Sequence, residues 1–100
     1  MPAAMIFRID IHTSNFDGYA FAVTYAGTLL YEEDLFSNIE GCLKAAADGF
    51  SADVIGAEVA FRGVVAGTYT RSQLLNDVAA IACHAKDTSN AIAFLERQAS

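Results

Sequence analysis

The sequence predicts an α+β domain in which a mainly antiparallel sheet of four or five strands carries helices on one face. Residues 5–12 and 18–25 alternate apolar with polar or small side chains, which is typical of strands with one buried face. Two segments that open with helix-capping motifs follow these strands along the chain. With 100 residues, the chain is long enough for one domain that buries a core without a metal or disulfide. We therefore expect residues 1–100 to form a single domain, with residues 1–4 disordered.

The first two predicted strands share one apolar face. Alternate residues are apolar in Met5–His12, and Gly18–Tyr25 repeats the pattern. A turn at Ala26 and Gly27 leads into a third strand, Thr28–Glu32, which completes an antiparallel meander. The side chains that we expect to face the helices are Phe7, Ile9, Ile11, Phe21 and Val23.

The first helix is expected to follow the meander directly. Ser37 and Glu40 have the spacing of a capping box, in which each side chain satisfies a backbone N–H of the first turn. The acids of residues 32–34 precede this box and add negative charge near the positive end of the helix dipole. Gly49 is expected to end the helix in the left-handed conformation.

Residues 52–70 have strand composition throughout, and their sequence is compatible with two strand arrangements. Either Arg62 and Gly63 turn the chain into a hairpin, whose second strand is Val64–Tyr69, or the segment is one bent strand. The predicted order of elements is therefore β-β-β-α-β-(β)-α.

The C-terminal part of the chain predicts two helices. Thr70 and Gln73 have the spacing of a second capping box, which opens a helix to about Lys86. The polar run 87–90 is expected to interrupt the helix, because these residue types favour caps and turns. A short final helix then covers Asn90–Gln98.

The net charge of −6 is concentrated in the first half of the chain, where seven acids face two bases. Such a field disfavours direct nucleic-acid binding and favours a basic protein partner, although an acidic surface also serves solubility. No signal peptide or membrane span is evident, and Cys42 and Cys83 are interpreted as core residues of a protein from the reducing cytoplasm. No cofactor is expected. The predicted partner-binding residues are Asp17, Glu32, Glu33 and Asp34.

Other reactive side chains have ordinary structural interpretations. Arg8, Asp10 and His12 share one strand face, where ion pairing or solvation of an open sheet face is favoured over proton transfer. No spacing supports a nucleophilic pair of His12 with either cysteine. The four tyrosines fit cross-strand packing, because a base-stacking platform would need basic neighbours.

The order strand, strand, strand, helix, strand, helix resembles the opening of the ribonuclease H-like fold. Residues 7–10 resemble its first strand ending near an Asp, 18–23 its second strand, and 38–40 the helix start that carries its Glu. The truncated version of this fold in HicB-type antitoxins is also similar, in the turn at residues 17–19 and in a single helix over 37–49. The resemblance covers about residues 5–61, and the Pro-rich turn and the C-terminal DNA-binding domain of the HicB type are missing.

The resemblance implies two alternative activities. A complete nuclease would hold two divalent metals on Asp10, Glu40 and Glu58, with a further carboxylate from Asp77 or Asp87. An antitoxin-like chain would instead be a non-enzymatic module that binds a partner protein, and this is the function that we expect.

A third hypothesis is self-association. The final helix carries apolar side chains on more than one side, and a symmetric homodimer would cover them. The predicted interface consists of Ile92, Phe94 and Leu95.

Overall fold

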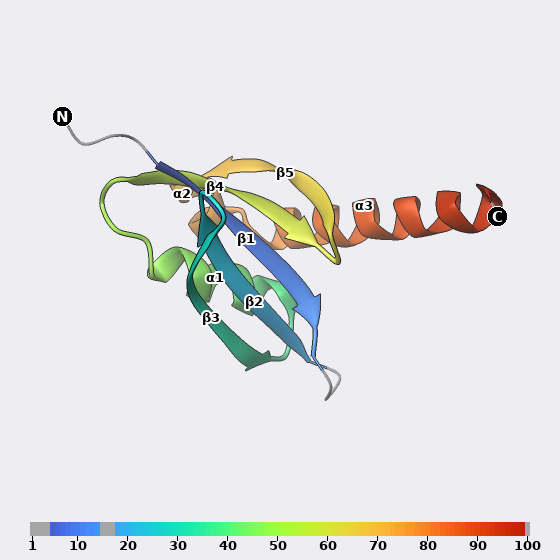
Figure 1. Cartoon of the computed structure of the whole chain (residues 1–100), viewed down its shortest axis with the longest axis horizontal. Coiled ribbons are helices and arrows are strands. Elements are labelled where there is room, and N and C mark those ends of the chain that lie inside the picture. The colour runs from blue at the N-terminus through green and yellow to red at the C-terminus, as the bar shows by residue number, and fades with distance from the viewer. Residues whose placement is uncertain (1–4, 15–17, 100) are drawn as a thin grey trace.

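The structure is a computed structural model, and it describes residues 5–14 and 18–99. Three strands, β1 (Met5–Thr13), β2 (Tyr19–Tyr25) and β3 (Thr28–Phe36), precede helix α1 (Ile39–Asp48). The chain continues through β4 (Val54–Phe61), β5 (Val64–Thr70), α2 (Arg71–Asn76) and α3 (Val78–Ala99), as Figure 1 shows. The predicted α+β class and order of elements are confirmed, with five strands.

The strands form one sheet in the order β3-β2-β1-β4-β5. Strand β1 is antiparallel to β2 and parallel to β4, whereas β2–β3 and β4–β5 are antiparallel pairs. The parallel pair arises because α1 crosses over the sheet and returns the chain to the far side of β1. The sheet is therefore mixed but mainly antiparallel.

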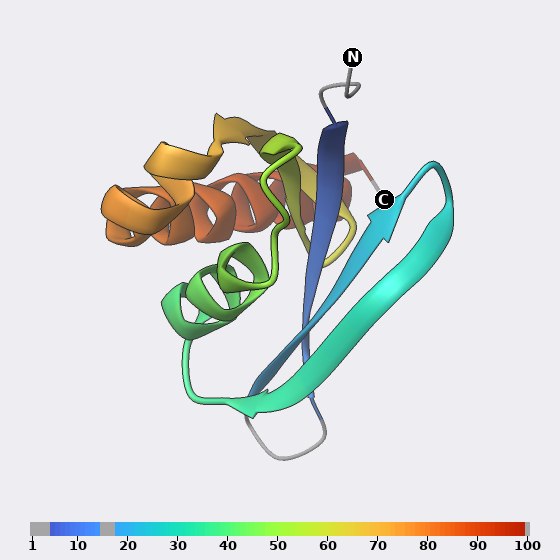
Figure 2. The same cartoon turned by 90° about the vertical axis from the view of Figure 1, so that its left-hand side faces the viewer.

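All three helices lie on one face of the sheet (Figure 2). The face predicted to be covered is confirmed, since Ile9 is 0% and Phe21 1% exposed while Arg8 and Asp10 on the other face are not buried. The core of this layer combines Ile9 and Phe21 with Leu43 of α1 and Leu74 of α2. No helix in the described part of the chain is both long enough and apolar enough to cross a membrane.

Residues 52–70, for which the sequence allowed either one bent strand or two strands, form a hairpin of β4 and β5. Arg62 and Gly63 have φ values of +53° and +80°, as the two central residues of a type I′ turn require. Ala26 and Gly27, with φ values of +52° and +82°, make the same turn between β2 and β3. These turns fix the registers of both hairpins.

Three predictions about α1 and its approach were wrong. Strand β3 continues to Phe36, so the acids of residues 32–34 belong to this strand. The N-cap is Asn38, whose side-chain oxygen accepts a hydrogen bond from the Gly41 N–H at 2.7 Å, one residue later than the predicted box at Ser37. Gly49 has a right-handed conformation, and its lack of a side chain makes room for the ring of Tyr31.

The C-terminal helices also break at a different place from the predicted one. The Thr70–Gln73 capping box is confirmed, but the chain leaves the helix at Asp77, which separates α2 from α3. The predicted interruption at 87–90 was wrong, because α3 runs through it without a break. Ala85 and Ser89 are both buried on one side of α3, so packing continues through the polar run and overrides its weak helix propensity.

The two cysteines have different surroundings. Cys42 of α1 is fully buried as predicted, whereas Cys83 of α3 is exposed, so its assignment to the core was wrong. Both thiols are free. Burial raises the pKa of Cys42 from 9.0 to about 11.

This shift predicts a loss of stability in alkali. Because the folded state retains the Cys42 proton more strongly than the unfolded state does, the contribution is complete below pH 9 and is lost as pH rises towards about 11. Urea unfolding at a series of pH values should show this decline, and Cys42→Ala should flatten it. A decline of equal size in Cys42→Ala would assign it to other groups, with Tyr31 the first to test by Tyr31→Phe because its pKa is also raised.

Candidate functional site

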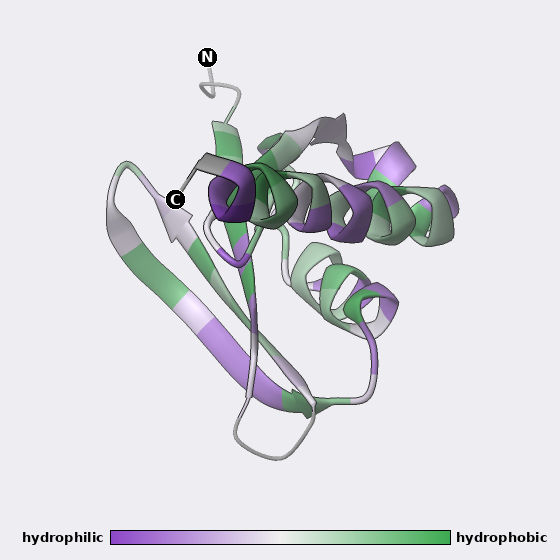
Figure 3. Ribbon diagram, turned by 90° about the vertical axis from the view of Figure 1, so that its right-hand side faces the viewer, coloured by the Kyte–Doolittle hydropathy of each residue, from purple (hydrophilic) through white to green (hydrophobic). Residues whose placement is uncertain are grey.

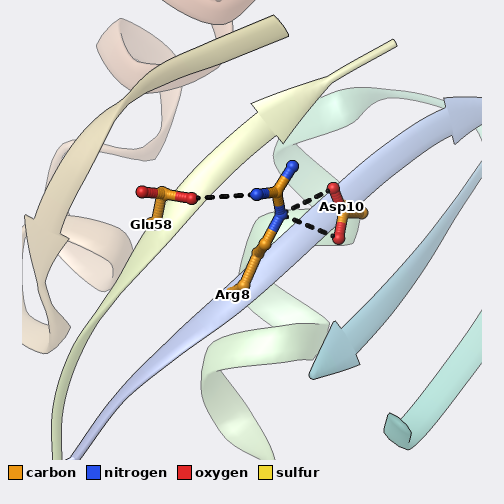
Figure 4. A network of polar contacts seen from close by, with 3 residues as sticks. All are labelled: Arg8, Asp10 and Glu58. Atoms are coloured by element: carbon orange, nitrogen blue, oxygen red, sulfur yellow. Dashed lines mark hydrogen bonds and ion pairs between the residues drawn. The ribbon is translucent and has the colours of Figure 1, made fainter. Parts of the chain in front are cut away.

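The centre of the uncovered sheet face carries a small ionic network (Figure 4). The Nε of Arg8 donates to both carboxylate oxygens of Asp10, at 3.0 and 3.1 Å, and its Nη1 donates to Glu58 at 3.2 Å. Arg8 and Glu58 are neighbours because β1 and β4 pair in parallel with these two residues in register. The side chains are 42% exposed for Arg8 and 37% for each acid, so solvent screens the network.

The pairing of Arg8 with Asp10 agrees with the ion-pair interpretation of this strand face, and Glu58 extends it. Sequence reasoning did not connect Arg8 with Glu58, because the two lie 50 residues apart and only the parallel register brings them together. The network combines two carboxylates with one guanidinium, so Arg8 offsets one of the two negative charges and contacts both acids.

The carboxylates implied by the nuclease resemblance occupy both faces of the sheet. Asp10 and Glu58 meet on the uncovered face, with Arg8 bound to both. Glu40 lies in the first turn of α1, in the helical layer on the opposite face. Asp77 ends α2, and Asp87 accepts a hydrogen bond from the Cys83 thiol at 3.7 Å. Among the residues that the structure describes, no group of three or more His, Cys, Asp or Glu side chains could hold a metal ion.

A second feature is a hollow of about 520 Å³ at the end of the meander, which we call the acidic hollow. Three of the four predicted partner-binding acids line it together; Asp17 lies outside the described residues. No Lys or Arg occurs among the described lining residues, so no cation within the hollow offsets the acids. The lining consists of His12, Thr13, Ser14, Ala20, Phe21, Glu32, Glu33, Asp34 and Leu35.

Strand β3 positions the acids of the hollow at an edge of the sheet. It pairs only with β2, and each of two register shifts inserts one extra residue into β3. Leu30 is the extra residue of the first shift, and the second lies between Glu33 and Phe36. Figure 3 shows the hydrophilic middle of β3 flanked by apolar segments. Bulges and charges of this kind also protect an edge from unwanted strand pairing, which is an alternative role for the acids.

The residue that follows the acids has an unusual conformation. Leu35 has a φ of +70° and is 79% exposed, although Leu is an apolar residue that seldom adopts positive φ. It places an apolar side chain beside three carboxylates at the rim of the hollow. Sequence reasoning missed Leu35, because neither its exposure nor its backbone conformation is visible in an apparently regular strand.

The negative charge of Glu33 affects the ionisation of Tyr31, which lies on the same strand. The hydroxyl of Tyr31 donates to the carbonyl oxygen of Ala46 at 2.6 Å and ties β3 to α1. Burial raises the pKa of Tyr31, and the nearby Glu33 carboxylate raises it further. The Glu33 carboxylate therefore lies close enough to the Tyr31 hydroxyl to disfavour its ionisation.

The two cysteines lie outside these two sites, whereas His12 belongs to the second of them. Cys42 is buried in α1, Cys83 lies exposed on α3, and His12 lines the acidic hollow, so the structure shows no pairing of His12 with either thiol. Three of the tyrosines pack against phenylalanine rings, with centroid distances of 5.6 to 6.2 Å. These contacts agree with the expected packing role.

Comparison with known proteins gives no family for this chain. No family model, curated protein or solved structure matches it.

Proposed function

We propose that the chain is a small, non-enzymatic interaction module that binds a basic partner protein through the acidic hollow. The observation that carries the proposal is the gathering of Glu32, Glu33 and Asp34 around one concave surface with no Lys or Arg in its described lining. Three acidic residues along one hollow give its surface a negative potential, which attracts a cationic group. The ionic network, by contrast, already contains its own cation in Arg8.

The shape and composition of the hollow favour a Lys or Arg side chain of the partner. Such side chains combine a charged head with an apolar stem, and the stem packs on apolar surface while the head meets carboxylates. Leu35 supplies exposed apolar surface directly beside the acids. The general acidity of the chain, with its net charge of −6, would also speed association with a basic surface.

Binding a protein without chemically changing it is what small antitoxins and phage-encoded inhibitors do, and we place the chain in that class, acting in the cytoplasm. The resemblance to the HicB-type version of the ribonuclease H-like fold supports this assignment. The β-β-β-α-β order of the first five elements agrees with the order expected from that resemblance. Two free thiols fit a reducing compartment.

Neutralising the acids of the hollow should weaken binding of a basic probe about tenfold. The variant Glu32→Gln, Glu33→Gln, Asp34→Asn removes three charges worth roughly 0.5 kcal/mol each, which together correspond to a factor of about ten. Fluorescence anisotropy with a flexible Lys- and Arg-rich peptide would measure the dissociation constant at low and at physiological salt. The loss should be largest at low salt, where charges are least screened.

A matched variant separates the hollow from total charge. Asp48→Asn, Asp53→Asn, Asp87→Asn removes three exposed acids elsewhere and should change the affinity much less. Equal weakening by both variants would reduce the effect to net charge and contradict a role of the hollow. Cleavage of RNA, DNA or a hybrid in Mg²⁺ or Mn²⁺ that disappears in Asp10→Asn would instead support the nuclease alternative.

A further inference from the structure

Helix α3 has two halves with different surroundings. Its first half packs on β4 and β5, with Val78, Ile81, Ala82 and Ala85 buried. Ser89 is the last buried residue, and every residue from Asn90 to Gln98 is exposed. Figure 1 shows the second half extending well past the end of the sheet. The protein is accordingly elongated, with extents of 50 × 27 × 26 Å.

A mainly apolar stripe runs from the packed half of α3, where Ala82 and Ser89 are also buried beside it, along the projecting half. Its positions follow one another at alternating steps of three and four residues, which is the spacing of a coiled-coil seam. We call this stripe the α3 seam. The α3 seam consists of Val78, Ile81, Ala85, Thr88, Ile92 and Leu95.

Exposure increases along the α3 seam, and all of its residues except Thr88 are apolar. Ile81 is 4% exposed where the sheet covers it, whereas Ile92 is 38% and Leu95 60% exposed beyond the sheet. Lys86, Asp87 and Arg97 lie away from the seam and Glu96 flanks it next to Leu95, so no position of the seam itself carries a charge. The projecting half therefore presents an apolar strip with the spacing that a second helix requires.

The projecting half also lacks the means to be a stable helix alone. Isolated helices shorter than about 12–15 residues are marginal in water, and most helices in proteins depend on packing of an apolar face. Residues 90–99 form ten residues of helix, and the run 87–89 before them consists of residue types with low helix propensity. A partner surface would supply the missing packing.

We propose that a second copy of the chain covers the exposed end of the α3 seam, Ile92 and Leu95, so that two projecting halves pair antiparallel about a twofold axis. The alternating steps make Ile92 an a position and Leu95 a d position of a heptad. In an antiparallel pair, a positions of one helix face d positions of the other, so Ile92 of one copy packs against Leu95 of its partner. A twofold interface brings the same patch together from both copies, and the uncharged seam opposes no like charges there. The second copy is thus a self-complementary occupant.

The geometry limits the strength and the consequences of this dimer. Ten residues of helix are only about 15 Å long, so two paired projecting halves bury less than the usual interface of about 800 Å² per partner. We therefore expect a weak dimer, with a dissociation constant in the micromolar range. Strand β3 lies at the far edge of the sheet from β5, against which α3 packs. The dimer would therefore leave two acidic hollows open and could engage a partner bivalently.

Phe94 provides a matched control within the same turns. At about 100° per residue, it lies about 200° around the helix from Ile92 and so faces away from the α3 seam. It is 54% exposed, comparable with Leu95 at 60%. The predicted interface set of Ile92, Phe94 and Leu95 therefore divides into two seam residues and one residue on the opposite side.

Sedimentation equilibrium over about 1–100 µM tests the proposal, a range chosen around the expected micromolar dissociation constant. The wild-type chain should approach twice the monomer mass, Leu95→Glu should be monomeric, and Phe94→Glu should remain dimeric. Far-UV circular dichroism of each variant checks that the fold is retained. A wild-type monomer at 100 µM would overturn the proposal, as would a dimer that survives Leu95→Glu or is abolished by Phe94→Glu. These results are independent of the peptide titration, so the dimer and the acidic hollow can fail separately.

Discussion

Gly56→Ala is expected to lower the free energy of unfolding by about 3 kcal/mol or more, a large share of the stability of a small domain. A Cβ at this position would overlap the carbonyl oxygen of Tyr69 and lie 3.1 Å from the Cα of Thr70. Both contacts are backbone atoms of β5, which pairs with β4 at this point, so no side chain can move aside to relieve them. Urea denaturation would measure the change.

Gly41→Ala is the matched control for this prediction. A Cβ at Gly41 would lie 3.1 Å from the Asn38 side-chain oxygen and 3.4 Å from the Phe36 ring, both of which belong to side chains. Replacing Gly by Ala inside a helix also gains about 1 kcal/mol of helix propensity, which offsets the tighter fit. Gly41→Ala should therefore stay within about 1 kcal/mol of the wild type. A Gly56→Ala protein as stable as the Gly41→Ala protein would contradict the close pairing of β4 and β5.

Ile9→Ala is expected to cost about 3–4 kcal/mol, and Ile6→Ala less than about 1 kcal/mol. The two substitutions remove the same atoms from the same strand. Ile9 is 0% exposed beneath the helices, whereas Ile6 is 50% exposed on the uncovered face. Truncation of Ile9 leaves a cavity in a packed core, while truncation of Ile6 mainly alters contact with water.

The comparison of these two variants tests the register of the central strand. A shift of one residue would exchange the faces of every side chain in β1. Chemical denaturation of both proteins should give a difference of at least about 2 kcal/mol. If Ile6→Ala were as destabilising as Ile9→Ala, the assignment of the covered face would be wrong.

Much of the fold could be predicted from the sequence where local pattern decides it. The covered face of β1 and β2 follows from a period of two, and the Thr70–Gln73 box follows from the capping spacing. The sequence did not decide whether the chain turns at Arg62, because an arginine at positive φ is uncommon and Arg-Gly does not identify a type I′ turn.

The rest depends on contacts that local pattern does not contain. The residue types of the run 87–90 favour a helix end. Ser89 is buried, however, and α3 stays helical through this run because its packing continues there. Cys83 looks like a core residue by composition, but the rotation of α3 leaves it in solvent. In each case tertiary packing outweighs a preference worth a few tenths of a kcal/mol per residue.

The candidate site could be predicted in part. The acids of residues 32–34 stand out in the sequence, but their convergence on one hollow with His12 requires the meander to bring β1 and β3 to the same end of the sheet. The contact of Arg8 with Glu58, which joins the second acid to the Arg8–Asp10 pair, requires the parallel pairing of β1 with β4. The sequence therefore indicated which residues are charged. Only the topology showed that Arg8 pairs with Asp10 and Glu58, whereas no Lys or Arg lies in the described lining of the hollow beside the acids of residues 32–34.

We propose that the acidic hollow is the surface that receives a basic partner. Titration of the ¹⁵N-labelled protein with the Lys- and Arg-rich peptide, followed by amide chemical shifts, tests where binding occurs. We predict that the largest shifts occur in residues 30–36 of β3 and in His12, Thr13 and Ser14, and that the charge-neutralised variant loses them. Shifts concentrated on α3 or around Arg8 and Glu58, with β3 unchanged, would contradict the claim.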